Sequence, residues 1–209
     1  MKSRILRFCG ALALWVVIFG LSVGGFYAGL RGGSGLVAAL TAEARGPRPD
    51  YAFLRMRFGL GFENDKDVSA FQPHHAAARP STEHATQGLQ SLEVEFPAGD
   101  ASAGIAIDLD GEECFDWSRM EALSFDAYNA ASVPAPVTIR LNSGPAEPRK
   151  QFETTVTLPA QETAKVTIGR AELAPALDLG CVSGIDIFMA HPPTTYFLYF
   201  DNFRREDRG

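Results

Sequence analysis

Two neighbouring segments place hydrogen-bonding side chains at every second residue. The alternation of apolar and polar residues predicts strands over residues 123–129 and 137–142. Their outward polar side chains are Asp126, Tyr128, Arg140 and Asn142. If the two strands pair, these side chains share one face that offers a ring, a guanidinium fork and two acceptors. We regard them as candidate ligand-binding residues, with an ordinary solvated sheet surface as the alternative.

The sequence contains no recognisable arrangement for catalysis. It lacks a nucleophile elbow or another signature of a Ser or Cys held by a His and an acid. Carboxylates are numerous, but nothing selects a pair that would flank a glycosidic bond. The spacing of His74, His75 and His84 matches no usual zinc site, and the prolines near them indicate a loop. We therefore expect a protein that is not an enzyme.

The segments that would position these residues indicate a single β domain. Beyond residue 61, apolar residues recur with a period of two in short runs separated by Gly, Pro, Asn and Asp. The expected fold is an all-β, antiparallel jelly-roll β-sandwich over residues 62–204, followed by a tail at 205–209. The predicted strands are Leu89–Phe96, Gly104–Leu109, Ala122–Asn129, Pro136–Asn142, Gln151–Leu158, Ala164–Ile168, Gly184–Ala190 and Thr195–Phe203.

The distribution of charge divides the chain near residue 61. Residues 1–61 contain eight Lys or Arg against two Asp or Glu, whereas residues 62–203 contain eight against twenty-one. An acidic domain repels phosphate groups, so we expect no nucleic-acid partner.

One long apolar segment precedes the domain. Residues 8–30 carry no charged side chain, and as a helix they would extend roughly 34 Å, enough to cross a hydrocarbon core of about 30 Å. We predict that the sandwich is preceded by one transmembrane signal-anchor helix at 8–30, which lies between an N-terminus at 1–7 and a linker at 31–61. A cleaved secretory signal, with small residues at Thr41–Ala44, is the alternative.

Positive residues indicate how this helix is oriented in a lipid bilayer. Lys2, Arg4 and Arg7 precede the apolar segment, and only Arg31 follows it closely. Because positive residues stay on the cytoplasmic side, we expect a single-pass membrane protein with a cytoplasmic N-terminus. Its domain would then be periplasmic or extracellular.

Two cysteines, Cys114 and Cys181, lie within the predicted domain. An even pair in an oxidising compartment is a disulfide candidate. Each lies ahead of a predicted strand, Leu123–Asn129 or Gly184–Ala190, so the sulfurs can meet if those strands are neighbours. Two separate buried thiols are the alternative.

Five short segments carry a resemblance to a known fold, and in order they are Phe62–Asp65, Thr82–Val94, Asp116–Ser118, Leu123–Asn129 and Tyr199–Phe203. Together they resemble the galactose-binding-like β-sandwich superfamily, which includes carbohydrate-binding modules attached to glycoside hydrolases. The sequence departs from the sugar-binding members in its shortage of aromatic platforms, because Trp117 lies in a segment that looks structural.

The resemblance also implies a structural Ca²⁺ ion. In that superfamily the ion often joins an acidic residue near the first strand to an Asp at the end of the last strand. The matching residues are Glu63 and Asp201, with Asp65 as a third candidate ligand. The alternative is that Glu63 caps a turn and Asp201 bonds backbone amides.

Two functions follow as expectations. The first is a non-catalytic, membrane-anchored extracytoplasmic module that binds a glycan or cell-envelope polymer. The second is an accessory or scaffolding subunit of a larger membrane protein complex, which docks through its transmembrane helix and its sandwich. The second is favoured by Gly20–Gly24 and Gly25–Gly29, whose small residues at GxxxG spacing permit close helix packing.

Overall fold

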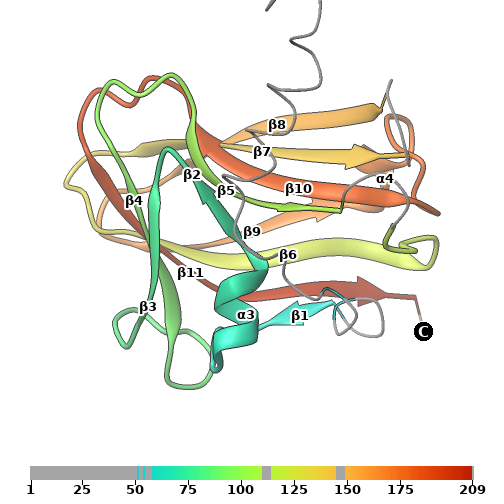
Figure 1. Ribbon diagram of the computed structural model, residues 1–209, viewed down its shortest axis with the longest axis horizontal. Helices are drawn as coiled ribbons and strands as arrows, with labels where there is room; N and C mark the ends of the chain where they lie inside the picture. The colour runs from blue at the N-terminus through green and yellow to red at the C-terminus, as the bar shows by residue number, and fades with distance from the viewer. Residues whose placement is uncertain (1–50, 52–53, 55–57, 110–113, 145–148, 209) are drawn as a thin grey trace, which may run out of the picture. The chain divides into compact units, whose positions relative to one another are not determined.

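Two antiparallel sheets make up most of the part of the chain that the structure describes. The computed structural model describes residues 51, 54, 58–109, 114–144 and 149–208. Figure 1 shows the two sheets as layers, with a five-stranded sheet above a six-stranded one. The predicted antiparallel β-sandwich is therefore confirmed.

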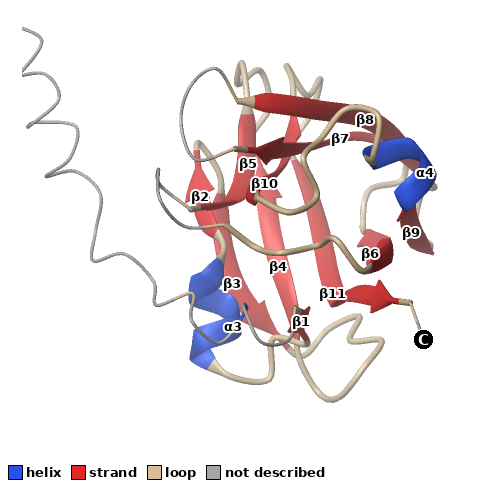
Figure 2. Cartoon of the chain, turned by 90° about the vertical axis from the view of Figure 1, so that its right-hand side faces the viewer, coloured by secondary structure: helices blue, strands red, loops and turns tan. Residues whose placement is uncertain are grey.

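The six-stranded sheet has the order β3-β4-β11-β6-β9, and β1 pairs with β11 beside this path. Its strands are β1 (Gly59–Leu60), β3 (Ala77–Ser81), β4 (Ser91–Phe96), β6 (Met120–Asn129), β9 (Thr163–Gly169) and β11 (Tyr196–Asp207). The five-stranded sheet has the order β2-β5-β10-β7-β8. Its strands are β2 (Gln72–His74), β5 (Ala103–Asp108), β7 (Ala135–Ser143), β8 (Lys150–Leu158) and β10 (Val182–Met189). Two short helices, α3 (Asp65–Ala70) and α4 (Arg170–Leu173), lie at the periphery (Figure 2).

The chain passes repeatedly from one sheet to the other. Only β3 and β4, and β7 and β8, follow one another within the same sheet, and every other connection between consecutive described strands crosses from one sheet to the other. Strands that follow one another in sequence therefore often lie in opposite sheets, and their outward side chains point to opposite surfaces. This connectivity decides which polar residues come together.

All eight strands predicted from alternation are present, with ends that differ by at most a few residues. Two short strands, β2 and β3, were not predicted, whereas β1 lies at the end of the linker segment of residues 51–60, whose alternating apolar residues favour a first strand. The sandwich is also longer than predicted, because β1 begins at Gly59 and β11 continues to Asp207.

The core lies between the two sheets and follows the predicted alternation. Leu123 and Phe125 of β6 and Ile139 and Leu141 of β7 are buried, and Arg140 between the last two is only partly covered. Ser124 is also buried, where its hydroxyl donates to Glu206. Trp117 is fully buried and packs edge-on against Phe58, with 5.4 Å between ring centroids. The structural role expected for this tryptophan is confirmed.

Cys114 and Cys181 form a disulfide, with their Cα atoms 4.7 Å apart. The expected reason for their proximity is wrong, because β6 and β10 belong to different sheets. Instead, the segment before β6 runs antiparallel to the start of β10. Phe115 forms a β-bridge with Val182, and each donates a backbone hydrogen bond to the other.

The predicted transmembrane helix at 8–30 and most of the predicted linker fall outside the described residues. Within the described ranges, no helix has both the length and the apolar character needed to cross a membrane. The anchor stays a prediction from the sequence.

Candidate functional site

The outward face of the five-stranded sheet arranges its side chains in three cross-strand rows. The central row is Gln72, Ala106, Asp186, Arg140 and Glu153, and the rows beside it are His74, Gly104, Phe188, Thr138 and Thr155, and Asp108, Gly184, Asn142 and Gln151. Because side chains alternate along each strand, the residues between these positions point into the core. The sheet register therefore gathers donors and acceptors from five strands on one surface.

Asp186 connects the central row to the edge strand β2. Its Oδ1 lies 2.8 Å from Nε2 of His74, and its Oδ2 lies 3.5 Å from Nη1 of Arg140. Arg140 also lies 2.9 Å from Oε2 of Glu153 through Nη2. The hydrogen bond to Asp186 raises the pKa of His74 above its ordinary value, although burial acts in the opposite direction. When His74 is protonated, charges of opposite sign thus alternate from His74 through Asp186 and Arg140 to Glu153.

A groove of about 260 Å³ lies on this face. Its lining residues are His74, Ala106, Ile107, Asp108, Asn142, Arg149, Ile185 and Asp186. The small residues Ala106 and Gly184 occupy the two strands in the middle of the face, which leaves it hollow between β2 and β7. Arg149 donates to Asp108 with 3.0 Å between Nη1 and Oδ1. The groove therefore presents carboxylate, amide, imidazole and guanidinium groups around a small-residue floor.

The four predicted ligand-binding residues do not form one site. Asp126 and Tyr128 lie on β6 in the six-stranded sheet, whereas Arg140 and Asn142 lie on β7 in the five-stranded sheet. The expectation that these two strands pair is wrong, because the chain crosses between the sheets after β6. Only Arg140 and Asn142 belong to the face with the groove.

Asp126 and Tyr128 lie under the loop of residues 82–90. His84 stacks on Tyr128 with 3.5 Å between ring centroids and meets Tyr199 edge-on at 4.7 Å. Asp126 accepts a hydrogen bond of 2.7 Å from Oγ1 of Thr86. Burial, together with the nearby carboxylates of Glu93 and Glu83, raises the pKa of Tyr199 to about 12. These contacts fasten the loop to the sheet.

Glu63 and Asp201 both bind backbone amides of that same loop. Oε1 of Glu63 accepts from the amides of Leu89 and Gln90, at 2.7 and 2.8 Å. Oδ2 of Asp201, which is buried, accepts from the amides of Thr86 and Gln87, each at 2.7 Å. The structure therefore gives both carboxylates the role that the sequence left open as the alternative to calcium.

Asp65 is the first residue of α3, and the helix is capped by Asn64, whose side chain accepts from the amides of Lys66 and Asp67. Among the described residues, no group of three or more His, Cys, Asp or Glu side chains is arranged to hold a metal ion. A cation between Glu63 and Asp201 would thus depend on backbone oxygens for the rest of its ligands.

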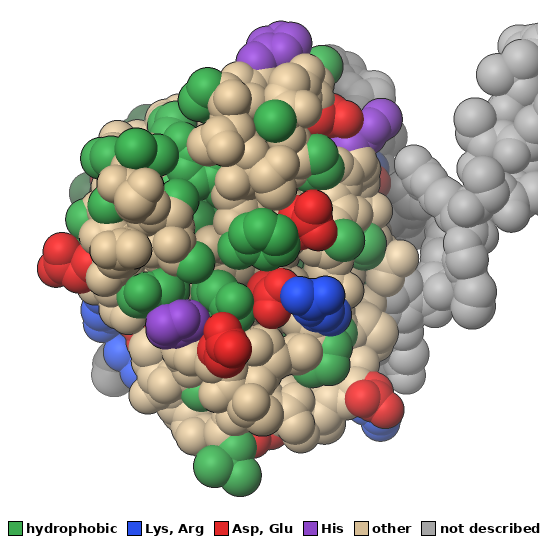
Figure 3. Space-filling model, turned by 90° about the vertical axis from the view of Figure 1, so that its left-hand side faces the viewer, with side chains coloured by type: hydrophobic (Ala, Val, Ile, Leu, Met, Phe, Trp, Pro, Cys, Tyr) green, Lys and Arg blue, Asp and Glu red, His purple; other side chains and the backbone are tan. Residues whose placement is uncertain are grey.

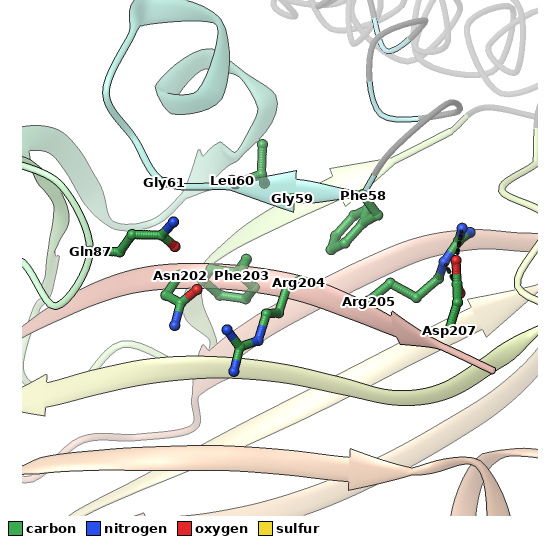
Figure 4. Close-up of a pocket in the computed structure, with 10 residues that line it drawn as sticks. All are labelled: Phe58, Gly59, Leu60, Gly61, Gln87, Asn202, Phe203, Arg204, Arg205 and Asp207. Carbon is green, nitrogen blue, oxygen red and sulfur yellow. Dashed lines mark hydrogen bonds and ion pairs between the residues drawn. The ribbon is translucent and has the colours of Figure 1, made fainter. Parts of the chain in front are cut away.

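A second and larger hollow, of about 500 Å³, lies beside β1 and the end of β11. Figure 4 shows Gln87, Asn202 and Arg204 along it, and Arg205 paired with Asp207 at one end. Its charged groups are engaged within the protein, since Nε of Arg204 lies 3.4 Å from Oε1 of Glu206. We take the groove on the five-stranded sheet as the candidate site because it lies within a sheet face, where neighbouring paired strands fix its lining.

The face of the molecule shown in Figure 3 carries acidic and basic side chains beside one another, among exposed hydrophobic ones, rather than a broad basic surface. This distribution agrees with the acidic balance of residues 62–203.

Sequence reasoning missed several residues of the candidate face and its groove, among them His74, Asp108, Arg149, Asp186 and Phe188. His74 was assigned to a loop because Pro73 precedes it, yet β2 is an edge strand, where proline is tolerated. A signal for Asp186 was present, since it is a charged residue between Ile185 and Ile187 in a predicted strand. The period of two places such a residue on the outward face.

No protein-family model matches the sequence, and no curated protein matches it. Solved structures do share its fold. An exo-β-agarase structure matches with a TM-score of 0.60 and 16% identity, covering 72% of this chain and 24% of the agarase chain. A family 11 carbohydrate-binding module from Clostridium thermocellum, in complex with a β-1,3-1,4-mixed-linked tetrasaccharide, matches with a TM-score of 0.55 and 14% identity, covering 71% of this chain and 95% of the module.

A third structure combines the CBM22-1 and GH10 modules of endo-1,4-β-D-xylanase 10B from Clostridium thermocellum with xylohexaose. It matches with a TM-score of 0.52 and 12% identity, over 72% of this chain and 28% of that chain. Identities this low show a common fold and nothing finer. The described domain therefore has the β-sandwich fold of carbohydrate-binding modules.

Proposed function

We propose that this chain is a non-catalytic, membrane-anchored extracytoplasmic module that binds a glycan or cell-envelope polymer on the outward face of its five-stranded sheet. The observation that supports this most is the groove of about 260 Å³, in which side chains from several strands present hydrogen-bonding groups. The fold shared with carbohydrate-binding modules, one of them bound to a tetrasaccharide, agrees with it.

The groove has the chemistry that a polyhydroxylated ligand needs. A sugar hydroxyl donates to a carboxylate or carbonyl oxygen and accepts from an amide or guanidinium group, and Asp186, Asn142 and Arg149 provide both types. Ligand sites are typically concave, with a few polar groups that fix orientation. The groove meets this description on a rigid element, because every strand that contributes to it is paired.

We propose no catalytic step for this face. Glycoside hydrolysis requires one carboxyl group as acid and a second across the scissile bond. The carboxylates of the groove are engaged within the protein instead, Asp108 by Arg149 and Asp186 by Arg140 and by a hydrogen bond with His74. Binding without turnover is the function that this arrangement supports.

The test compares the two sheet faces in the full chain, kept in a mild detergent. We expect Ala106→Phe, which fills the groove, and Asn142→Ala to weaken retardation in affinity gels that contain mixed-linked β-1,3-1,4-glucan, xylan or agarose. The matched control is Tyr128→Ala on the opposite sheet, which should leave retardation unchanged. Loss of binding in the Tyr128 variant, with normal binding by both groove variants, would refute the proposed site.

The anchor belongs to the same proposal. Residues 8–30 would hold the domain on the outer side of a bilayer, so the full chain should stay with membranes after alkaline carbonate extraction. Protease added to intact cells or spheroplasts should then remove the domain. Protection of the domain from protease would contradict the orientation.

Structural Ca²⁺ is a further part of the proposal that rests on the resemblance. Glu63 and Asp201 hold one loop from two sides, and an ion between them would strengthen that attachment. If the ion is present, Ca²⁺ will raise the melting temperature of chelator-treated protein, and Glu63→Gln will abolish the increase. An unchanged melting temperature would leave these carboxylates as amide acceptors only.

A further inference from the structure

We infer that Phe188 is the sugar-stacking platform of the groove face and that Arg140 covers it in the free protein, so that a glycan must displace the guanidinium group to bind. This inference rests on the proposed function. It assigns the stacking role to Phe188, which the sequence analysis did not recognise as an aromatic platform. It also identifies the class of ligand, a β-linked glucan or xylan whose pyranose rings have apolar axial C–H faces.

Phe188 is an aromatic residue on the outward face of the sheet. It follows Asp186 by two residues on β10, so both side chains point to the same side, away from the core. It is absent from the cluster of buried residues that forms the core, although only 6% of it is exposed. Its low exposure therefore comes from neighbours on the outer surface.

Arg140 is one of those neighbours. Its guanidinium carbon lies 4.5 Å from the centroid of the Phe188 ring. The group is held by Glu153 at 2.9 Å and Asp186 at 3.5 Å, and about a third of the arginine side chain, 32%, is exposed. A cation–π contact and partly exposed ion pairs are weak interactions. A ligand can therefore displace this cover at a modest loss of affinity.

Gly104 lies between Phe188 and His74, and these two residues fill the space that a side chain would occupy there. A Cβ atom at this position would lie 2.7 Å from Cβ of Phe188 and 2.8 Å from Cε1 of His74. Glycine is thus required for the phenyl and imidazole rings to lie near each other on the sheet. With Arg140 moved aside, the face would offer a phenyl ring next to the imidazole of His74 and the carboxylate of Asp186.

This combination suits a pyranose ring. The axial C–H face of a β-linked glucose or xylose residue is apolar and packs on an aromatic ring, while its equatorial hydroxyls point outward to polar groups. Phe188 would take the apolar face, and His74, Asp186 and Asn142 would take the hydroxyls. The guanidinium group of Arg140 can donate hydrogen bonds but cannot accept them. When it moves aside, the exposed ring of Phe188 offers the sugar a matching apolar surface.

The experiment measures affinity of the full chain in detergent for mixed-linked β-1,3-1,4-glucan tetrasaccharide and for xylohexaose by titration calorimetry. We expect Phe188→Leu to weaken binding at least tenfold and Arg140→Ala to strengthen it by about threefold to tenfold. Phe188→Leu together with Arg140→Ala should bind as weakly as Phe188→Leu alone. The matched control is Phe197→Leu, an exposed phenylalanine on the six-stranded sheet, which should not change affinity.

Proton NMR of the sugar gives an independent readout. Stacking on Phe188 should shift the axial pyranose protons upfield, and Phe188→Leu should abolish that shift. Normal affinity of Phe188→Leu, with weakened binding by Asn142→Ala, would refute the platform and leave the proposed function standing. Absence of binding by the wild type and by Arg140→Ala alike would refute both. Melting temperatures close to that of the wild type exclude unfolding as the cause of any loss.

Discussion

Removing the disulfide should destabilise the domain by an amount that follows from the chain length between its cysteines. Cys114 and Cys181 are 67 residues apart, and closing a loop of this length lowers the entropy of the unfolded chain by the equivalent of about 4 kcal/mol at 25 °C. For a domain of this size, that loss corresponds to a decrease of roughly 8–16 °C in melting temperature. The change is the double substitution Cys114→Ser and Cys181→Ser.

The assay is equilibrium unfolding in urea, followed by tryptophan fluorescence, because Trp117 is fully buried in the core. Cys9→Ser is included in every protein compared, so that only the pair of interest differs. We expect a lower unfolding midpoint for the double variant and for the wild type with reductant, to the same extent. The reasoning would be refuted if the protein that retains Cys114 and Cys181, denatured without prior reduction, showed two reactive thiols. Equal unfolding midpoints for all samples would refute it as well.

Three further predictions concern the loop, the histidine and the sheet face. Asp201→Ala should destabilise the fold by about 2–4 kcal/mol in urea unfolding, because several backbone amides lose their acceptor. The same change should expose the loop of residues 82–90 to protease. An unchanged unfolding midpoint would contradict this prediction. Because the pKa of His74 is raised in the folded state, its contribution to stability is fully present below the ordinary value of about 6.5 and is lost as pH rises through the raised pKa. The stability difference between wild type and His74→Gln should therefore shrink between pH 5 and pH 8, and a constant difference would show that protonation does not matter. Gly104→Ala should lower the free energy of unfolding by about 1–3 kcal/mol, because its Cβ would lie 2.5 Å from the carbonyl oxygen of Ile187. Gly59→Ala should lower it less, because the nearest atom to its Cβ would be 3.8 Å away. Equal losses would argue against the steric explanation.

Alternation along the sequence was sufficient to find the eight long strands, because each has one face in the core. The same alternation says nothing about which sheet a strand joins. β6 and β7 are equally regular, yet they lie in opposite sheets, and this placed Tyr128 and Arg140 on opposite surfaces. Sheet membership depends on where the chain crosses the core, which is set by packing between distant segments.

The polar face was predictable only in part for a related reason. Arg140 and Asn142 were recognised because they alternate with apolar residues in one strand. His74 and Phe188 depend on partners 112 and 48 residues away, Asp186 in the first case and Arg140 in the second. An outward phenylalanine also looks like a core residue until its covering arginine is known.

The pairing of β1 with β11 has a mechanical consequence. Gly59 faces Arg204 and Leu60 faces Phe203, so the segment entering the domain and the segment leaving it lie side by side and antiparallel. Tyr51, Leu54 and Phe58, which precede β1, are also buried, so a pull on the chain from this side would load their core contacts together with the two-residue pairing. Under load these contacts and the two-residue strand should yield before the long strands slide, because each long strand is held by many more backbone hydrogen bonds.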